Sequence, residues 1–240
     1  MNGFAKKLTL LIFILIPSVE AEQSLQVVTE GWWPFNYVDE TGELVGSSTV
    51  WVKSVLEKAK IPYHLDMYPW HRSYNLALKR KNVLIYSIFR SPKRESLFHW
   101  VCSLPEKPVN KIYKLSSRSD IVVKNNEDLH NYSVNVIRGA YTHDYLLSLG
   151  LTEERNIHLA ADNDANVNKL LLGRVDLIVD FDHSIQRILK ENGLQTNHVE
   201  VVHTFKKDPK LCMAISKGTP QTTVDRIKNA HQALLEQNPQ

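Results

Sequence analysis

The stretch Val83-Leu84-Ile85-Tyr86-Ser87-Ile88-Phe89-Arg90-Ser91-Pro92-Lys93-Arg94-Glu95 runs from an apolar segment directly into a cationic turn. Its first part, Val83–Ile88, is a short β-rich run without interspersed charges, which is typical of a strand buried on both faces. Ser91 then supplies an N-cap, and Pro92 suits the first turn of a helix. A buried strand that leads straight into a helix is the repeating unit of α/β folds.

The same alternation of short β-rich runs and amphipathic helices continues along nearly the whole chain. Repeated β-α-β units of this kind predict an α/β fold with parallel-type sheets covered by helices. The pattern predicts a closing helix at Thr222–Gln237 and strands at Leu25–Thr29, Tyr63–Met67, Val83–Ile88, Ser133–Ile137, Asp176–Asp180 and Leu211–Ser216.

Two segments break this rhythm. Cys102–Asn110 contains two prolines, and Phe205–Lys210 contains Lys206-Lys207-Asp208-Pro209. Because they bracket a segment of about 100 residues, the size of a small lobe, we expect a middle lobe at 106–205. This lobe would be inserted into an outer lobe made of 22–105 and 206–240. Two such crossings are what a hinge between lobes requires; two ordinary surface loops are the alternative.

The N-terminus has the pattern of an export signal. Lys6 and Lys7 precede the apolar run Leu8–Ile16, and small residues follow up to Ala21, which is typical of a cleavable signal peptide. The run is shorter than the roughly 20 residues that span a bilayer, although an uncleaved anchor is the alternative. We therefore expect residues 1–21 to be removed and the mature protein to be periplasmic.

Charge and cysteine content exclude several classes of protein. The chain has 29 Lys and Arg against 26 Asp and Glu, with both signs interleaved, so neither a nucleic-acid nor a membrane-surface partner is indicated. Cys102 and Cys212 are the two cysteines and lack the spacing of a zinc site. We expect no metal and no cofactor. In an oxidising compartment the cysteines form either one disulfide or two buried thiols.

Aromatic residues follow two of the predicted strands. Trp32 and Trp33 lie in the loop Glu30–Tyr37, and Trp70 follows Tyr68-Pro69. Ligands of open α/β sheets bind beyond the carboxyl ends of the strands, so these rings are candidate ligand-stacking surfaces. The alternative is that some of them fill the core.

The cationic turn is the candidate anion site. An arginine placed beside Ser87 and backbone N–H groups makes a bidentate clamp for a carboxylate, and we expect Arg94 to be that arginine. Arg90 is assigned a supporting or structural role, and Phe89 lies between the strand and the turn. No glycine-rich phosphate cradle is present. A solvated basic turn is the alternative.

The middle segment offers two further candidates. At Ala140 and Tyr141 a strand passes through glycine into a helix, whose first N–H groups form a natural anion site. In Asp180-Phe181-Asp182, one carboxylate is a candidate partner for a ligand ammonium. The other is a candidate cap for a helix that begins near Ser184.

Signatures of enzymes are absent from the sequence. It contains no Gly-x-Ser-x-Gly elbow, no His-Glu-x-x-His zinc motif and no dinucleotide fingerprint. The candidate acids and bases for a catalytic cleft are Glu30, His71 and one of Asp180 and Asp182. We therefore expect a binding protein and not an enzyme.

Taken in order, several motifs resemble the family 3 periplasmic solute-binding proteins, the amino-acid type substrate-binding components of ABC transporters. The resemblance covers the mature chain and rests on Trp32-Trp33-Pro34-Phe35, Gly42-Glu43-Leu44-Val45-Gly46, Pro69-Trp70, Ser87 through Arg94, Phe98-x-Trp100-Val101 and Gly173-Arg174-Val175-Asp176.

This resemblance implies the two-lobed type 2 periplasmic-binding fold, which closes on a ligand. It implies that Arg94 holds the ligand α-carboxylate, with help from Ser87 and the helix start at Ala140–Tyr141. Trp32 and Trp70 would form aromatic walls. The family's amino-group carboxylate maps close to Phe181, which would leave its role to Asp180 or Asp182.

The chain departs from the family pattern in two places. Gly46-Ser47-Ser48 stands where many members have Gly-x-Asp, and Phe89 replaces a small hydroxyl residue. These departures widen the candidates to anionic or aromatic solutes. We expect a monomer that binds a small carboxylate-bearing solute, such as an amino acid, for a membrane permease. The alternatives are an extracytoplasmic sensor and an enzyme of the cyclohexadienyl dehydratase type.

Overall fold

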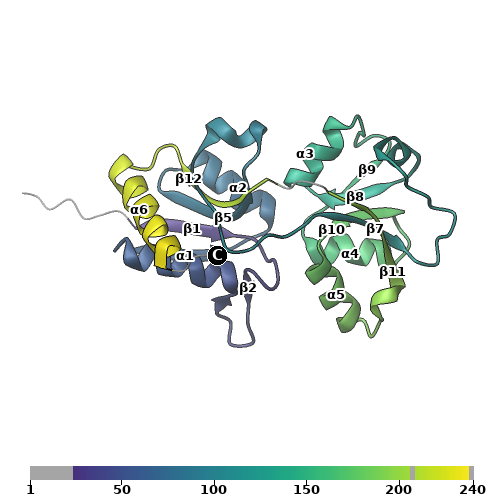
Figure 1. Ribbon diagram of the computed structural model, residues 1–240, viewed down its shortest axis with the longest axis horizontal. Helices are drawn as coiled ribbons and strands as arrows, with labels where there is room; N and C mark the ends of the chain where they lie inside the picture. The colour runs from purple at the N-terminus through teal and green to yellow at the C-terminus, as the bar shows by residue number, and fades with distance from the viewer. Residues whose placement is uncertain (1–23, 206–208, 238–240) are drawn as a thin grey trace, which may run out of the picture.

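Two five-stranded sheets, each covered by helices, form two lobes that lie side by side (Figure 1). The structure is a computed structural model that describes residues 24–205 and 209–237. The predicted signal peptide, residues 1–21, lies outside the described residues. So do residues 206–208, which belong to the second predicted break.

The first sheet has the strand order β4-β1-β5-β12-β6. Strands β1, β4 and β5 are parallel, and β12 runs antiparallel to both of its neighbours. The strands span Leu25–Thr29 (β1), Tyr63–Met67 (β4), Val83–Phe89 (β5), Phe98–Cys102 (β6) and Leu211–Ser216 (β12).

The second sheet has the strand order β11-β7-β10-β8-β9. Strands β8, β9 and β10 are parallel, and β7 runs antiparallel to β10 and β11. The strands span Lys111–Leu115 (β7), Val134–Ile137 (β8), Ile157–Ala160 (β9), Leu177–Asp180 (β10) and Val199–Thr204 (β11).

Helices α1, α2 and α6 pack on the first sheet, and α3, α4 and α5 pack on the second (Figure 1). The helices span Ser47–Lys58 (α1), Trp70–Lys79 (α2), Tyr141–Ser148 (α3), Asn163–Leu171 (α4), Asp182–Glu191 (α5) and Gln221–Gln237 (α6); shorter elements are the hairpin Tyr37–Val38 (β2) and Leu44–Val45 (β3) and the 3-10 helices Pro92–Leu97 (η1), Asn126–Asn131 (η2) and Thr196–His198 (η3).

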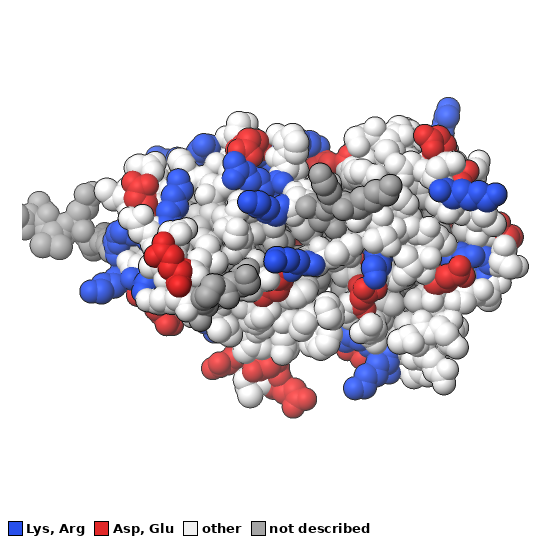
Figure 2. Space-filling view, viewed as in Figure 1, with Lys and Arg blue, Asp and Glu red and all other residues white. Residues whose placement is uncertain are grey.

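Each lobe has its own apolar core, because each sheet buries one set of side chains under helices on either face. On the surface, acidic and basic side chains are interleaved over both lobes on the face shown in Figure 2. Within residues 24–205 and 209–237, no helix combines the length and apolar character needed to cross a membrane.

The predicted α/β class is confirmed, but the prediction of parallel-type sheets is wrong, because both sheets are mixed. The chain leaves the first sheet after β6 and returns to it at β12 from the second lobe. Because β12 comes from the second lobe, it runs antiparallel to its neighbours β5 and β6. In the same way, β7 comes from the first lobe and runs antiparallel to its neighbours β10 and β11.

A disulfide between Cys102 and Cys212 joins the two points where the chain leaves and re-enters the first sheet. The two residues are register partners on β6 and β12. His231 of α6 supports the same place: one ring nitrogen lies 2.8 Å from the Cys102 carbonyl oxygen, and the other accepts a hydrogen bond from Trp51. The base of both interlobe connections is therefore fixed to the first lobe.

Reduction of this disulfide is expected to lower the free energy of unfolding by about 2–5 kcal/mol, because the bridge closes a long loop in the unfolded chain. Urea denaturation with and without reductant measures the change, and the double variant C102S/C212S should be insensitive to reductant. Thiol counting on the unreduced, denatured protein should find no free thiol; two free thiols would refute the bridge.

Gly46 connects the aromatic loop to α1. Its φ is 110°, a conformation that suits glycine, and a Cβ there would collide with the carbonyl oxygen of Phe35. Gly42 also has a positive φ, 86°, but a Cβ there would meet no atom within 4 Å.

Gly46→Ala is therefore expected to destabilise the protein more than Gly42→Ala, which carries the backbone cost of about 1–2 kcal/mol without the collision. Urea denaturation of both variants makes the comparison. Equal losses would show that the aromatic loop moves freely to accept the extra atom.

Candidate functional site

The carboxyl ends of the parallel strands of both lobes face one another across a cleft. Glu30 follows β1, Tyr68 follows β4, and Phe89 ends β5. On the second lobe, α3, α4 and α5 begin close after β8, β9 and β10. This edge is where open α/β sheets bind ligands.

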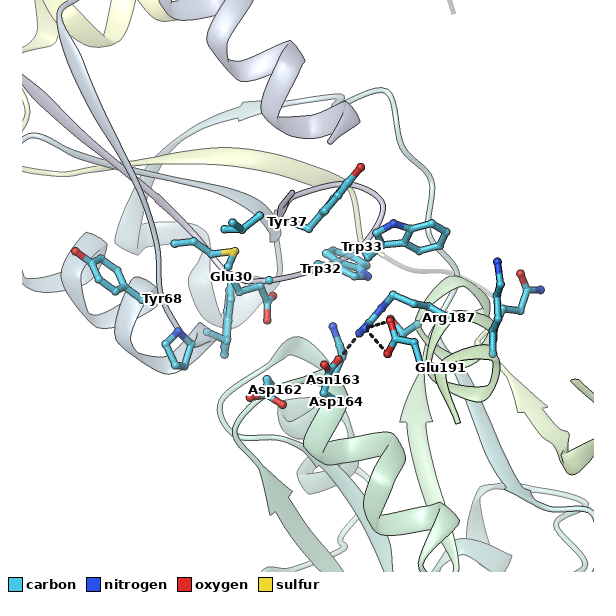
Figure 3. A pocket seen from close by; sticks show the side chains of 18 residues that line it. Glu30, Trp32, Trp33, Tyr37, Tyr68, Asp162, Asn163, Asp164, Arg187 and Glu191 are labelled. Atoms are coloured by element: carbon cyan, nitrogen blue, oxygen red, sulfur yellow. Dashed lines mark hydrogen bonds and ion pairs between the residues drawn. The ribbon is translucent and has the colours of Figure 1, made fainter. Parts of the chain in front are cut away.

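Two cavities that share part of their lining lie in this cleft. An outer opening of about 950 Å³ carries Trp33 and Tyr37 on the first lobe and Asp164 and Arg187 on the second (Figure 3). Beside it lies a much smaller inner chamber of about 40 Å³, which is lined by Glu30, Trp32, Trp70, Ser87, Phe89, Arg94, Asn110, Ile137, Ala140, Tyr141, Thr142, Asn163, Val179 and Phe181. Four residues line both cavities and are called the junction: Glu30, Trp32, Trp70 and Asn163.

Arg94 lies in the wall of the inner chamber and is 2% exposed. Its guanidinium carbon lies 5.2 Å from the centroid of the Trp70 ring and 5.1 Å from that of Tyr74. Its Nη atoms donate to the carbonyl oxygens of Phe89, at 3.2 Å, and Gly139, at 2.9 Å. Burial lowers the pKa of Arg94, yet an arginine stays protonated in proteins. Within the described part of the chain, no carboxylate forms an ion pair with it.

Ser87 connects β5 to the aromatic loop. It is the extra residue of a β-bulge opposite β12 and has a φ of 59°, a strained value for a side chain other than glycine. Its hydroxyl donates to Asn36 Oδ1 at 2.6 Å, and Asn36 Nδ2 donates to the Glu30 carbonyl at 2.5 Å. The bulge thus fixes the position of Glu30 as well as that of Ser87.

Aromatic rings from both lobes meet across the chamber. Trp32 lies 4.5 Å from Phe181 and 6.1 Å from Phe89, measured between ring centroids, and Phe89 lies 5.7 Å from Tyr141. Trp33 is 37% exposed and lines the outer opening but not the inner chamber. Trp32 therefore contacts an aromatic ring of the other lobe, whereas Trp33 lies at the outer opening; a stacking role for either ring stays a prediction.

The start of α3 closes the chamber from the second lobe. Trp70 Nε1 donates to the Gly139 carbonyl at 2.9 Å, beside the bond from Arg94. Lys93 of the first lobe and Asp144 of α3 form an ion pair at 2.5 Å. The lobes are therefore in direct contact at this side of the cleft.

Two acidic groups near the chamber have strongly raised pKa values. Burial, followed by the negative charge of Asp180, raises the pKa of Glu30 to about 8, although the residue is partly exposed through the outer opening. Burial raises the pKa of Asp180 to about 7, against the effect of hydrogen bonds from Asn166 and the Phe181 backbone.

Asp182 belongs to a different environment. Lys111 Nζ lies 2.5 Å from one of its oxygens, and the Tyr113 hydroxyl donates to the other at 2.6 Å. Burial acts to raise its pKa, but these two partners lower it overall. The predicted helix cap is wrong, because α5 begins at Asp182 with Phe181 as its N-cap and without a side-chain capping bond.

The structure brings most of the predicted site residues together. Seven of them line the inner chamber: Trp32, Trp70, Ser87, Phe89, Arg94, Ala140 and Tyr141. Arg90, Asp180 and Asp182 line neither cavity. Arg90 instead pairs with Glu95 on the surface, its Nε donating at 2.7 Å.

Asn163 is the junction residue that the sequence analysis missed. It follows β9, a strand that was not predicted, and it is the first residue of α4, where Asp162 caps the helix by accepting from Ala165 N at 2.8 Å. The signal that could have revealed it is the short apolar run ending at Ala160, followed by an aspartate at an N-cap spacing.

The free energy of unfolding of the ligand-free protein is expected to fall as pH rises from about 4.5 to 8, through the contribution of Glu30. Over this range the folded protein holds a proton on Glu30 that the unfolded chain releases, so raising the pH favours unfolding. Chemical denaturation of wild type and Glu30→Gln across this range isolates the effect, because the histidine contributions cancel in the difference. Parallel pH profiles would contradict the raised pKa.

Searches against protein-family models and curated protein sequences found no match to this chain. Solved structures do resemble it. A histidine kinase sensor domain with similarity to periplasmic binding proteins matches with a TM-score of 0.75 and 17% identity, covering 90% of this chain and 91% of that one. An ancestral arginine-binding protein bound to arginine matches with a TM-score of 0.74 and 18% identity, covering 90% and 93%.

The arginine-, lysine-, histidine-binding protein ArtJ from Geobacillus stearothermophilus matches with a TM-score of 0.74 and 17% identity, covering 90% of each chain. At such identities the likeness establishes the fold alone. It agrees with the fold that the sequence motifs implied. The chain therefore has the two-lobed α/β fold of the periplasmic binding proteins.

Proposed function

We propose that this protein is an exported solute-binding protein that encloses a small carboxylate-bearing solute between its two lobes. The observation that carries the proposal is Arg94, a buried cation in the chamber wall that forms no ion pair with a carboxylate of the described residues. Burying a charge is costly unless a partner compensates it. A solute carboxylate would be that partner, and the guanidinium is suited to bind it in a bidentate manner.

The surroundings of Arg94 suit an anionic group. Ser87 lies in the same chamber, and so does the start of α3 at Ala140–Thr142; the first N–H groups of a helix lack intrahelical partners and favour anions. Similar folds include proteins named for binding arginine, lysine and histidine, and one ancestral protein bound to glutamine. These ligands all bear a carboxylate, which supports the assignment of the ligand class.

Delivery of the solute to a membrane permease is the role we propose, with export through the signal peptide at residues 1–21. The likeness to a histidine kinase sensor domain makes sensing the second candidate. Deleting the gene separates the two: loss of uptake of the bound solute supports transport, whereas intact uptake with a lost transcriptional response supports sensing. Export predicts a periplasmic protein whose first residue is Glu22, measurable by mass spectrometry.

Catalysis is not part of the proposal. Of the acid and base candidates Glu30, His71, Asp180 and Asp182, Glu30 alone lines the cavities, so these four residues do not form an acid–base pair across the cleft. Turnover of prephenate or arogenate by the purified protein would overturn this part of the proposal.

Replacing Arg94 is expected to weaken solute binding by about 30-fold or more, because the loss of a buried charge partner costs about 2–5 kcal/mol. Arg94→Met is the sharpest variant, since it keeps an apolar stem near the rings of Trp70 and Tyr74 and removes the charge. Arg94→Lys should recover part of the affinity, because an ammonium lacks the planar fork.

Calorimetric titration uses the solute that is retained through native purification and identified by mass spectrometry. Arg80→Met, an exposed arginine at the end of α2, is the matched control and should bind like wild type. Thermal melts of the ligand-free proteins separate a binding defect from a folding defect. Wild-type affinity in Arg94→Met, with an unchanged melt, would place the anion site elsewhere.

A further inference from the structure

Helix α3, which lies at the edge of the second lobe that faces the first (Figure 1), begins without a cap from its N-cap side chain. The N-cap residue is Ala140, which has no polar side chain. His143 supplies an acceptor instead, because its ring Nδ1 accepts a hydrogen bond from the Gly139 backbone N–H at 3.2 Å. A side chain at the third helical position that reaches back to an N–H before the helix resembles one half of a capping box. His143 therefore holds Gly139 in place.

Gly139 is also the residue whose carbonyl joins the two lobes. Its oxygen accepts hydrogen bonds from Trp70 Nε1 and Arg94 Nη2, each at 2.9 Å. A glycine has no Cβ to restrict its backbone, so the hydrogen bonds around it decide where its carbonyl points. His143 fixes Gly139 from the second lobe, and Trp70 and Arg94 meet it from the first. The contact between the lobes thus depends on a histidine that touches neither Trp70 nor Arg94 through a hydrogen bond of its own.

The imidazole of His143 is placed between two alternative partners. Because Nδ1 accepts from Gly139, the neutral ring carries its proton on Nε2. Nε2 is buried, has no hydrogen-bond partner among the described residues, and lies 3.3 Å from Glu153 Oε1. In the protonated ring both nitrogens are donors, so Nδ1–H would oppose the Gly139 N–H while the positive charge is attracted to Glu153. Protonation therefore exchanges the bond to Gly139 for an ion pair with Glu153.

The groups around His143 act on its protonation in both directions. The side chain is 7% exposed, and this burial lowers the pKa of His143 below the usual value of 6.5. The carboxylates of Glu153 and of Asp144, the next residue of α3, act to raise this pKa. Lys93 of η1 and Arg138, which follows β8, act to lower it. The neutral form is therefore the main form at neutral pH, and the charged form is reached in mild acid.

We propose that His143 positions Gly139 for its contact with Trp70 and Arg94 while the ring is neutral, and that protonation of the ring releases this contact between the lobes. In this step the ring binds one proton from solvent at Nδ1, and the hydrogen bond from the Gly139 N–H is lost. The contact is held at neutral pH and is lost as the pH falls through the lowered pKa of His143. The inference goes beyond the proposed function, since it concerns the ligand-free protein and requires no solute.

NMR of the ligand-free protein observes both ends of this connection. The ring ¹⁵N shifts of His143 report its tautomer and its protonation, and the indole N–H resonance of Trp70 reports the bond to the Gly139 carbonyl. Wild type is expected to show the Nε2–H tautomer at neutral pH. As the pH falls, the Trp70 indole resonance should shift with the same midpoint as His143, below pH 6.5. The Trp70 signal is assigned as the one missing from Trp70→Phe.

Two substitutions of His143 separate positioning from packing. His143→Asn places an amide oxygen where Nδ1 lies and does not titrate between about pH 5 and 8, the range of histidine, so the Trp70 resonance should stay at its neutral-pH position. His143→Leu has no acceptor, so the resonance should take its acidic position throughout. A merely structural ring predicts the opposite, with the contact kept by leucine and disturbed by asparagine. Any titration of Glu30 or Asp180 is common to all of these proteins and cancels in the comparison.

His71→Asn is the matched control, because His71 is a second histidine beside Gly139: a Cβ on that glycine would lie 3.7 Å from the His71 ring. This variant should keep the wild-type pH response of Trp70. A Trp70 resonance that does not follow His143 in wild type overturns the inference, as does an unchanged pH response in His143→Asn. Thermal melts at pH 7 verify that the variants fold; if His143→Leu does not, wild type against His143→Asn decides alone. None of these outcomes bears on solute binding, which the Arg94→Met titration tests separately.

Discussion

The carbonyl oxygen of Gly139 accepts hydrogen bonds from both Trp70 and Arg94, and the arrangement of the cleft depends on this contact. Gly139 lies where the chain turns from β8 into α3, and its φ of 69° suits a glycine. The turn presents a second-lobe carbonyl to two donors of the first lobe. With the lobes joined at this point, the rings of Trp32 and Phe181 meet, and the inner chamber is closed on that side.

The buried charges of the cleft respond differently to a low-dielectric environment. Arg94 cannot give up its proton, so its charge is spread over two carbonyl oxygens and two aromatic faces. Glu30, in contrast, can bind a proton and become neutral, and burial raises its pKa to about 8. The ligand-free cleft therefore keeps a fixed positive group and an acid that is neutral at pH 7.

Most strands of the first sheet could be predicted from apolar runs or, for β4, from apolar residues at every second position. β1, β4 and β12 have the predicted bounds, and β5 is one residue longer than predicted. Four strands of the two large sheets were missed, β6, β7, β9 and β11, and each contains a charged or histidine side chain that interrupts its apolar pattern. Lys114 of β7 shows why: it is 6% exposed, and its ammonium donates to the Ile121 carbonyl at 2.9 Å, a compensation that no local pattern reveals.

The sequence by itself determined that the chain is an α/β protein interrupted twice, with a cationic turn and an aromatic loop at strand ends. Such features follow from local periodicity and from turn chemistry, which act over a few residues. Only the tertiary structure decided which polar groups share the cleft. Asp180 and Asp182 are near neighbours in sequence, yet neither lines the cavities, whereas Glu30 and Asn163 line both cavities from separate lobes. Burial and pairing depend on how two sheets are placed against each other, and contacts of such long range leave no signature in local sequence.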